Sequence, residues 1–260
     1  MTKAVITIHG FLTDTKDFGR LYDYLDFYDK VVPFEVPGHN GDVDFSLFTT
    51  QDTIQSLLTT FDNLSAKYNC VDVVGFSMGG ALATFLCACR NVRKAVFLAP
   101  SNRYINWVSP LSAVKFYIRF AVDMVKKKQF QTDEVKNYFE NSALSAQIAY
   151  KRILPNINLH TFAVFKELMD MSNAAVEKAS PVKVPALLLW GELDELVPKA
   201  SIDFVCKHFS DVMTQFIPDI GHAMLYTNKD NMLINRIVNF LSDGKLSPDV
   251  PFTNKLPQKK

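Results

Sequence analysis

Six short apolar runs, separated by stretches of helical periodicity, constrain the fold of this chain more than any other feature of its sequence. The runs cover residues 3–8, 30–34, 71–74, 93–98, 184–190 and 213–217. Helical spacing of apolar side chains is clearest over residues 50–68, and it also occurs over residues 18–28 and 231–241. Strands that alternate with helices of about ten or more residues form βαβ units. The chain is therefore predicted to be an α/β protein whose parallel sheet carries helices on both faces.

The alternation is interrupted over residues 101–180. No convincing strand occurs there, whereas three stretches have helical periodicity and many aromatic side chains: residues 111–128, 133–150 and 159–178. These aromatics could form the core of a helical subdomain, or the insertion could cap the carboxyl ends of the strands and line a substrate pocket. We expect a cap, with core packing for most of its individual side chains. The predicted organisation is a core of residues 1–100 and 181–260 with a helical cap of residues 101–180.

Composition excludes several classes of partner. Hydrophobic residues make up 48% of the 260-residue chain, charged residues make up 21%, and the formal net charge is +1. Such a chain has no field that would attract nucleic acid or an anionic membrane, and no apolar run reaches the length of a membrane span or of a signal peptide core. The four cysteines have neither metal-binding nor redox spacing. We expect a cytoplasmic protein with reduced thiols, without nucleic-acid or integral-membrane partners; the oligomeric state is left open, a dimer being one option.

The run at residues 71–74 leads into Gly75-Phe76-Ser77-Met78-Gly79, which is followed by an Ala- and Leu-rich stretch. This order predicts a strand, a sharp turn and a helix. A nucleophile elbow needs that setting, because its strained turn lifts the serine hydroxyl off the sheet and leaves no room for bulky side chains two residues away. Gly75 and Gly79 meet this demand. The string alone is a weak signal, since Gly and Ser are common residues; its position between strand and helix gives it weight.

Two later strand ends carry groups that a nucleophilic serine needs. His222 follows the last run, and it is the histidine whose position suits a base within reach of the serine. Three carboxylates follow the run at residues 184–190, namely Glu192, Asp194 and Glu195, and each could accept the other imidazole N–H. In an open parallel sheet the carboxyl ends of the strands meet at one edge, where ligands bind. We therefore expect the serine, the histidine and one carboxylate to converge there.

Together these segments resemble the α/β-hydrolase superfamily, and within it the small bacterial carboxylesterases and monoacylglycerol-lipase-like serine hydrolases. The matching segments are His9-Gly10-Phe11, Pro37-Gly38-His39, Gly75-Phe76-Ser77-Met78-Gly79-Gly80, Gly191-Glu192-Leu193-Asp194 with Val197-Pro198, and Gly221-His222. They span nearly the whole chain apart from the insertion. Members of the family usually have an antiparallel hairpin before the His-Gly strand, and this chain has no residues for it. The resemblance thus implies an α/β-hydrolase fold with about six parallel strands.

The resemblance also implies roles for individual residues. Ser77 would be the nucleophile, His222 the base and Asp194 the acid, in preference to the neighbouring glutamates. The backbone N–H groups of Met78 and Phe11 would form the oxyanion hole. No metal and no cofactor is implied.

The predicted function is a serine carboxylesterase that hydrolyses short- to medium-chain esters, monoacylglycerols included, through an acyl-enzyme. Trp107, Phe116 and Phe162 are the candidates for lining its substrate pocket. A serine at position 77 argues against haloalkane dehalogenases and epoxide hydrolases, which need a carboxylate there, and against dienelactone hydrolases, which use a cysteine. Met78 differs from the Trp that prolyl aminopeptidase-like members commonly carry. Two alternatives are a thioesterase or carbon–carbon bond hydrolase with the same triad, and a non-catalytic ligand-binding protein.

Overall fold

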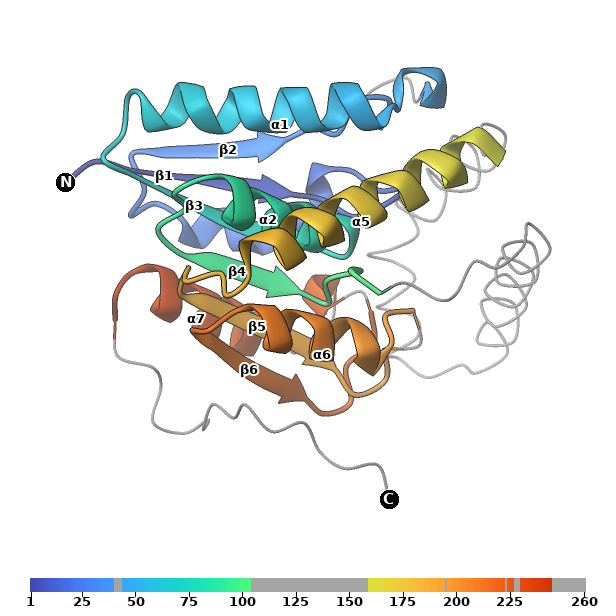
Figure 1. Cartoon of the computed structure of the whole chain (residues 1–260). Helices are drawn as coiled ribbons and strands as arrows, with labels where there is room; N and C mark the ends of the chain where they lie inside the picture. Colours follow the sequence, from blue (N-terminus) through green and yellow to red (C-terminus); the bar gives the residue numbers. More distant parts are fainter. Residues whose placement is uncertain (40–43, 104–158, 195, 223, 227–229, 245–260) are drawn as a thin grey trace.

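The computed structural model describes residues 1–39, 44–103, 159–194, 196–222, 224–226 and 230–244. Within them the chain forms a six-stranded sheet in the order β2-β1-β3-β4-β5-β6, and every neighbouring pair is parallel (Figure 1). The strands are β1 (Lys3–Ile8), β2 (Lys30–Phe34), β3 (Cys70–Phe76), β4 (Ala95–Leu98), β5 (Ala186–Gly191) and β6 (Val212–Ile217). The predicted sheet of about six parallel strands is confirmed.

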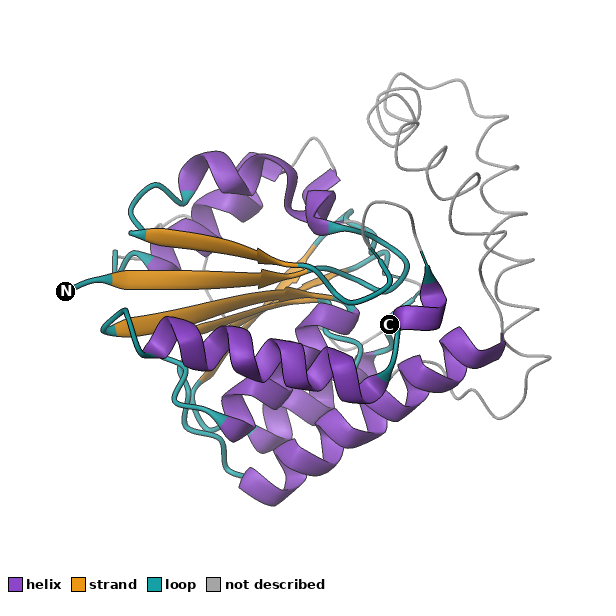
Figure 2. Cartoon of the chain, turned by 90° about the horizontal axis from the view of Figure 1, so that it is seen from above, coloured by secondary structure: helices purple, strands orange, loops and turns teal. Residues whose placement is uncertain are grey.

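Helices cover both faces of the sheet (Figures 1 and 2). One face carries α1 (Thr50–Ser65), α2 (Met78–Cys89), α5 (Leu159–Ala179) and α6 (Lys199–His208), and the other carries the 3-10 helix η1 (Thr15–Tyr24) and α7 (Asp230–Leu241). Two single 3-10 turns are η2 (Phe45–Leu47) and η5 (Met224–Tyr226). This arrangement encloses the central strands on both sides, so β3, β4 and β5 are apolar throughout almost their whole length.

The first helix differs from its prediction. Apolar spacing predicted a helix from residue 18 to about residue 28, whereas η1 begins at Thr15, has 3-10 geometry and ends at Tyr24. Gly19 interrupts it with φ 41° and ψ −124°, a backbone conformation that L-residues with side chains rarely adopt. The glycine divides η1 into two short pieces while Phe18 and Leu21 both stay buried.

Helix α5 lies in the last part of the predicted cap, yet much of it packs against the core. Val164 and Leu168 are buried, and α5 contacts both α2 and α1. Asn102, at the start of the insertion, donates from Nδ2 to Asn173 Oδ1 of α5 at 3.0 Å. The core and the predicted cap therefore share α5, and the division at residues 101 and 180 stays a prediction. The two other predicted helices of the insertion lie outside the described residues.

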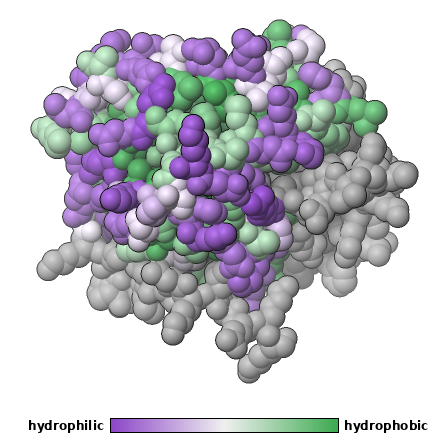
Figure 3. Space-filling view, viewed as in Figure 1, coloured by the Kyte–Doolittle hydropathy of each residue, from purple (hydrophilic) through white to green (hydrophobic). Residues whose placement is uncertain are grey.

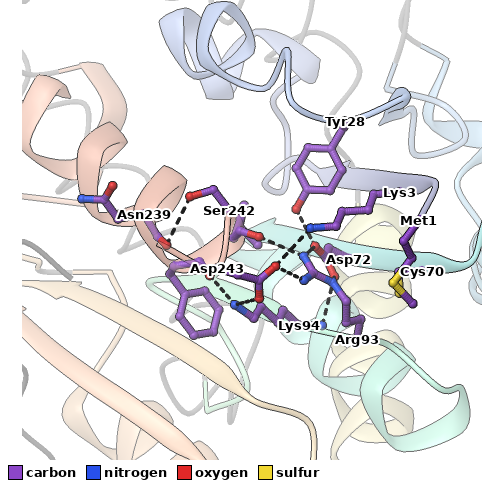
Figure 4. A network of polar contacts seen from close by, with 12 residues as sticks. Met1, Lys3, Tyr28, Cys70, Asp72, Arg93, Lys94, Asn239, Ser242 and Asp243 are labelled. Carbon is purple, nitrogen blue, oxygen red and sulfur yellow. Dashed lines mark hydrogen bonds and ion pairs between the residues drawn. The ribbon is translucent and has the colours of Figure 1, made fainter. Parts of the chain in front are cut away.

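Charged side chains gather at the amino ends of the central strands (Figure 4). Asp72, fully buried in β3, accepts hydrogen bonds from Tyr28 Oη at 2.5 Å and from the guanidinium of Arg93. Arg93 and Lys94 each pair with Asp243, just beyond α7, at 2.7 Å. Both cations also donate to the last carbonyl groups of α7, where the helix dipole favours positive charge. This network fastens α7 to the sheet, and the Lys94 hydrogen bond holds the pKa of the Asp243 carboxyl well below its usual range.

The surface seen in Figure 3 mixes hydrophilic side chains with smaller areas of hydrophobic ones. Among the residues that the structure describes, no helix combines the length and the apolar character that crossing a membrane requires.

Candidate active site

The register of the sheet brings the predicted site segments to one edge. Ile8 pairs with Gly75, so the turn after β1 lies beside the turn after β3. Gly191 pairs with Ile217, which places the loop after β5 beside the loop after β6. The chain changes direction across the sheet between β1 and β3, because β2 lies on one side of β1 and all later strands lie on the other. Ligands of open α/β sheets bind at the carboxyl ends of the strands near such a switch point.

Ser77 occupies a strained turn between β3 and α2. Its φ of 54° and ψ of −115° are uncommon for a residue with a side chain. Backbone hydrogen bonds hold it there: its N–H donates to Leu98 O at 2.9 Å, and its carbonyl accepts from Ala81 N–H at 3.2 Å and Ser101 N–H at 3.0 Å. This strand–turn–helix geometry is the one that the sequence predicted for a nucleophile elbow.

Glycines make the close approach of this turn to β1 and α2 possible. A Cβ on Gly79 would lie 1.9 Å from Ile8 O, and a Cβ on Gly75 would lie 2.2 Å from Gly79 O. Both distances are far below van der Waals contact, so neither position can hold a side chain without a backbone shift. The start of α2 therefore packs directly on the end of β1.

His222 connects the serine to a carboxylate. Its Nε2 lies 3.0 Å from Ser77 Oγ, and its Nδ1 lies 2.9 Å from Asp194 Oδ2. Because an ionised carboxylate only accepts hydrogen bonds, Nδ1 carries the ring proton and the Nε2 lone pair faces the serine hydroxyl. The ring of Phe76 lies next to the imidazole, with 5.0 Å between ring centroids. This is the hydrogen-bond geometry that a serine nucleophile and its base require.

Asp194 is held by its own loop. Its Oδ1 accepts the backbone N–H groups of Leu196 and Val197, both at 2.9 Å, and its side chain is fully buried. These bonds leave Oδ2 for the imidazole. Of the two other carboxylates that the sequence offered, Glu192 is exposed and its Oε2 accepts from Asp219 N–H at 3.3 Å, while residue 195 lies outside the described residues.

One predicted oxyanion donor directly follows the serine in the chain, and the other lies in the turn after β1, the strand that pairs with β3. Met78 is the first residue of α2, so its N–H has no partner within the helix, and Phe11 lies in the turn after β1. Among the hydrogen bonds of the described residues, neither N–H donates to a protein acceptor.

His9 fixes the peptide that contains the Phe11 N–H. His9 is fully buried, and its Nε2 accepts from Val36 N–H at 3.1 Å, so its Nδ1 carries the proton and donates to Gly10 O at 2.9 Å. Burial lowers the pKa of His9 to about 4, which keeps the ring neutral near pH 7. Because Gly10 O and the Phe11 N–H belong to one planar trans peptide, they point in opposite directions. Holding the carbonyl therefore sets the direction of the N–H.

The side chain of Phe11 lies in a cluster of rings. Its centroid is 4.6 Å from that of Phe165 and 5.7 Å from that of Phe162, both on α5, and 6.0 Å from that of Phe48. His39 adds a fourth ring at 6.2 Å, and burial lowers the pKa of this histidine to about 3. Of the three predicted pocket residues, Phe162 thus contacts the turn that carries Phe11. Trp107 and Phe116 lie outside the described residues.

Sequence reasoning missed one buried polar group beside this site. Asp17 belongs to a Thr- and Asp-rich segment that has the composition of an exposed loop, yet its carboxyl is buried and accepts from Gly10 N–H at 2.9 Å. Within the described part of the chain, no group of three or more His, Cys, Asp or Glu side chains is arranged to hold a metal ion.

Comparison with known proteins gives a family match over most of the chain. The family model described as serine aminopeptidase, S33, matches residues 1–229. A curated relative, the Mycoplasma pneumoniae protein named "Putative esterase/lipase 2", is 23% identical over 256 residues, which cover 94% of this chain and 91% of the relative.

Solved structures share the fold. The monoacylglycerol lipase of Paleococcus ferrophilus superposes with a TM-score of 0.65 at 17% identity, covering 92% of this chain and 94% of the lipase. A structure reported for the metagenome-derived lipolytic enzymes LipS and LipT gives a TM-score of 0.64 at 15% identity, covering 93% of this chain and 94% of that chain. At these identities the superpositions establish the architecture alone.

Proposed function

The chain belongs to the serine aminopeptidase S33 family of α/β-hydrolases, and from this premise we propose that it is a serine carboxylesterase acting on short- to medium-chain esters, monoacylglycerols included. The observation that carries the proposal is the unbroken hydrogen-bonded series from Asp194 through His222 to Ser77, with 2.9 Å and 3.0 Å between its polar atoms. The family assignment agrees with the resemblance read from the sequence, and members of this family are hydrolases.

The proposed reaction has two halves. Ser77 Oγ bonds to the ester carbonyl carbon while His222 Nε2 takes its proton, and Asp194 stabilises the imidazolium that forms. The tetrahedral intermediate places its negative oxygen near the N–H groups of Phe11 and Met78, and each such donor contributes about 3 kcal/mol to lowering the barrier. Collapse breaks the bond to the alcohol, which leaves with the proton from Nε2. Water then attacks the acyl-enzyme by the same sequence, with His222 again as base, and releases the acid and the serine.

The surroundings of Phe11 favour an uncharged acyl group. Phe11 and Phe162 are partly exposed and offer apolar contacts beside the turn that carries a proposed oxyanion donor, while the buried rings of Phe48 and Phe165 pack against Phe11. An aminopeptidase would also have to bind the charged ammonium of a peptide terminus, and none of the ring neighbours of Phe11 carries a carboxylate to pair with it. We include in this proposal the helical cap of residues 101–180 and the lining role of its aromatics Trp107, Phe116 and Phe162. A cytoplasmic location is also proposed, supported by the four cysteines, none of which forms a disulfide.

The decisive experiment combines turnover with active-site labelling. Purified protein should hydrolyse p-nitrophenyl butyrate, and a fluorophosphonate should modify it at Ser77, as located by peptide mass spectrometry. Ser77→Ala should lower kcat by about three orders of magnitude or more and abolish labelling, with an unchanged circular dichroism spectrum. An acyl-CoA thioester and an aminoacyl p-nitroanilide, assayed in parallel, separate esterase from thioesterase and aminopeptidase activity. Folded wild-type protein that neither turns over nor labels would favour the non-catalytic ligand-binding alternative.

A further inference from the structure

Asp17 is a buried carboxyl group that the proposed chemistry does not use. It lies in the first turn of η1 and is 6% exposed. Its Oδ2 accepts two hydrogen bonds, one from Gly10 N–H at 2.9 Å and one from the hydroxyl of Thr13. No Lys or Arg of the described residues forms an ion pair with it, and burial raises its pKa to about 7. Within the described residues the fold therefore buries a carboxyl group without a Lys or Arg counter-charge, which is energetically unfavourable.

The two donors that Asp17 binds belong to the turn that carries a proposed oxyanion donor. The His9–Gly10 peptide is held by Asp17 through the Gly10 N–H, and the next peptide is held by His9 through Gly10 O. Gly10 is thus fixed on both sides, and the second of these peptides contains the Phe11 N–H. A hydrogen bond at each end of one residue leaves its backbone little freedom to rotate.

The turn also contains a strained residue that needs such support. Leu12 has φ 61°, in the left-handed region that residues with side chains rarely adopt. The Thr13 hydroxyl, one residue later, bonds to the same carboxylate oxygen as the Gly10 N–H. Asp17 therefore clamps the turn on both sides of Phe11 and Leu12. Without this acceptor the buried Gly10 N–H would lose its partner, and the turn would shift to find another.

Packing places this clamp next to the serine and histidine. A Cβ on Gly10 would meet Thr13 Oγ1 at 3.1 Å, Phe76 Cδ1 at 3.2 Å and Asp17 Oδ2 at 3.3 Å, so all three side chains pack closely around Gly10. The Phe76 ring in turn lies beside the His222 imidazole. A shift of the turn would reach the site directly, and misplacing a reacting or stabilising group by about 1 Å can lower a rate about 100-fold.

We propose that Asp17 is a positioning residue for the oxyanion hole: its Oδ2 fixes the direction of the Phe11 N–H by holding Gly10 and Thr13, and it makes no contact with substrate. This inference rests on the proposed function, because it assigns Asp17 a role in the same site.

The test compares three variants with p-nitrophenyl butyrate as substrate. Asp17→Ala removes the acceptor and should lower kcat about 10- to 100-fold while KM stays within about threefold, since the oxyanion forms only in the transition state. Asp17→Asn should stay within about threefold of wild type, because its amide oxygen can take the place of Oδ2. Asp14→Ala is the matched control: Asp14 caps the same helix by accepting Lys16 N–H at 2.8 Å and does not touch Gly10. It should also stay within about threefold.

Amide hydrogen exchange of residues 9–13 supplies a second readout that does not depend on activity. Exchange at Gly10 should be at least about tenfold faster in Asp17→Ala than in wild type, and close to wild type in Asp17→Asn. If Asp17→Ala does not fold, Asp17→Ser takes its place, because the shorter side chain also leaves the Gly10 N–H without its acceptor.

Four results would overturn the inference: unchanged kcat in Asp17→Ala, an equal loss in Asp14→Ala, a loss in Asp17→Asn as large as in Asp17→Ala, or unchanged Gly10 exchange. Wild-type protein without esterase activity or Ser77 labelling would instead contradict the proposed function, and hydrogen exchange would still report whether Asp17 holds the turn.

Discussion

Replacing Ser77 by Gly and by Ala should reveal the conformational strain stored at the elbow. Both changes remove the hydroxyl and its hydrogen bond to His222, so both should lower kcat by about three orders of magnitude or more. They differ in the backbone, because the φ of 54° and ψ of −115° at this position suit Gly and disfavour any residue with a Cβ. A residue held in such a region carries about 1–3 kcal/mol of strain. The Gly variant is relieved of that strain, whereas the Ala variant retains it.

A control position removes the other differences between Gly and Ala. Thr49 is the N-cap of α1, as Ser77 is the N-cap of α2, but its φ of −124° and ψ of 153° are ordinary extended backbone. Thr49→Gly and Thr49→Ala therefore report how much Gly and Ala differ in chain entropy and capping without strain. At each position the free energy of unfolding of the Ala variant is subtracted from that of the Gly variant. Subtracting the result for position 49 from the result for position 77 should leave a stabilisation by Gly of about 1–3 kcal/mol.

Urea unfolding of the four variants, followed by circular dichroism, measures this double difference. In thermal unfolding it corresponds to a shift of about 2–4 °C for each kcal/mol in a chain of this size. A double difference within about 0.5 kcal/mol of zero would refute the reasoning, because it would mean that the turn accepts a Cβ without strain.

Three further predictions concern the acid, the buried carboxyl and the elbow. Asp194→Asn should lower kcat about 10³- to 10⁴-fold, because an amide can reverse the imidazole tautomer, whereas Glu192→Gln, which changes an exposed neighbour, should leave it near wild type; steady-state kinetics with p-nitrophenyl butyrate measures both. Burial raises the pKa of Asp17 from 3.8 to about 7 in the folded protein, so folding binds a proton and the contribution of Asp17 to stability falls as the pH rises from about 4 to about 7. The free energy of unfolding of Asp17→Asn relative to wild type should therefore increase over that range, by at most about 4 kcal/mol at 1.36 kcal/mol per pKa unit. Urea unfolding that gives the same difference between the two proteins at pH 4 and at pH 8 would contradict this. Gly79→Ala should yield little folded protein because its Cβ would lie 1.9 Å from a backbone oxygen of β1, while Gly221→Ala, whose nearest atom is at 3.7 Å, should fold; soluble yield and circular dichroism distinguish the two.

The sequence was sufficient for the architecture and for the segments that carry the site. Each apolar run became a strand. For β1, β3, β4 and β5 the reason is that a buried parallel strand needs a continuous apolar stretch, which is visible locally. The elbow was visible for the same reason: its Gly residues are required by contacts within a few residues of Ser77 and with the adjacent β1. Local pattern was less reliable where a single residue overrides it, as Gly19 does in η1.

Only the tertiary structure decided which side chains meet. The serine and the histidine are 145 positions apart, and nothing local to either one indicates a distance of 3.0 Å between their atoms. From the residues alone three carboxylates were candidates for the acid; in the structure the loop after β5 turns the Asp194 side chain inward, where its Oδ2 meets His222. Asp17 was not a candidate at all, because its burial is created by the packing of η1 against the turn after β1 and has no counterpart in the composition of the segment. Periodicity reports the environment of a residue along its own strand or helix, whereas an active site is made by the approach of loops from separate strands, which the register of the sheet determines.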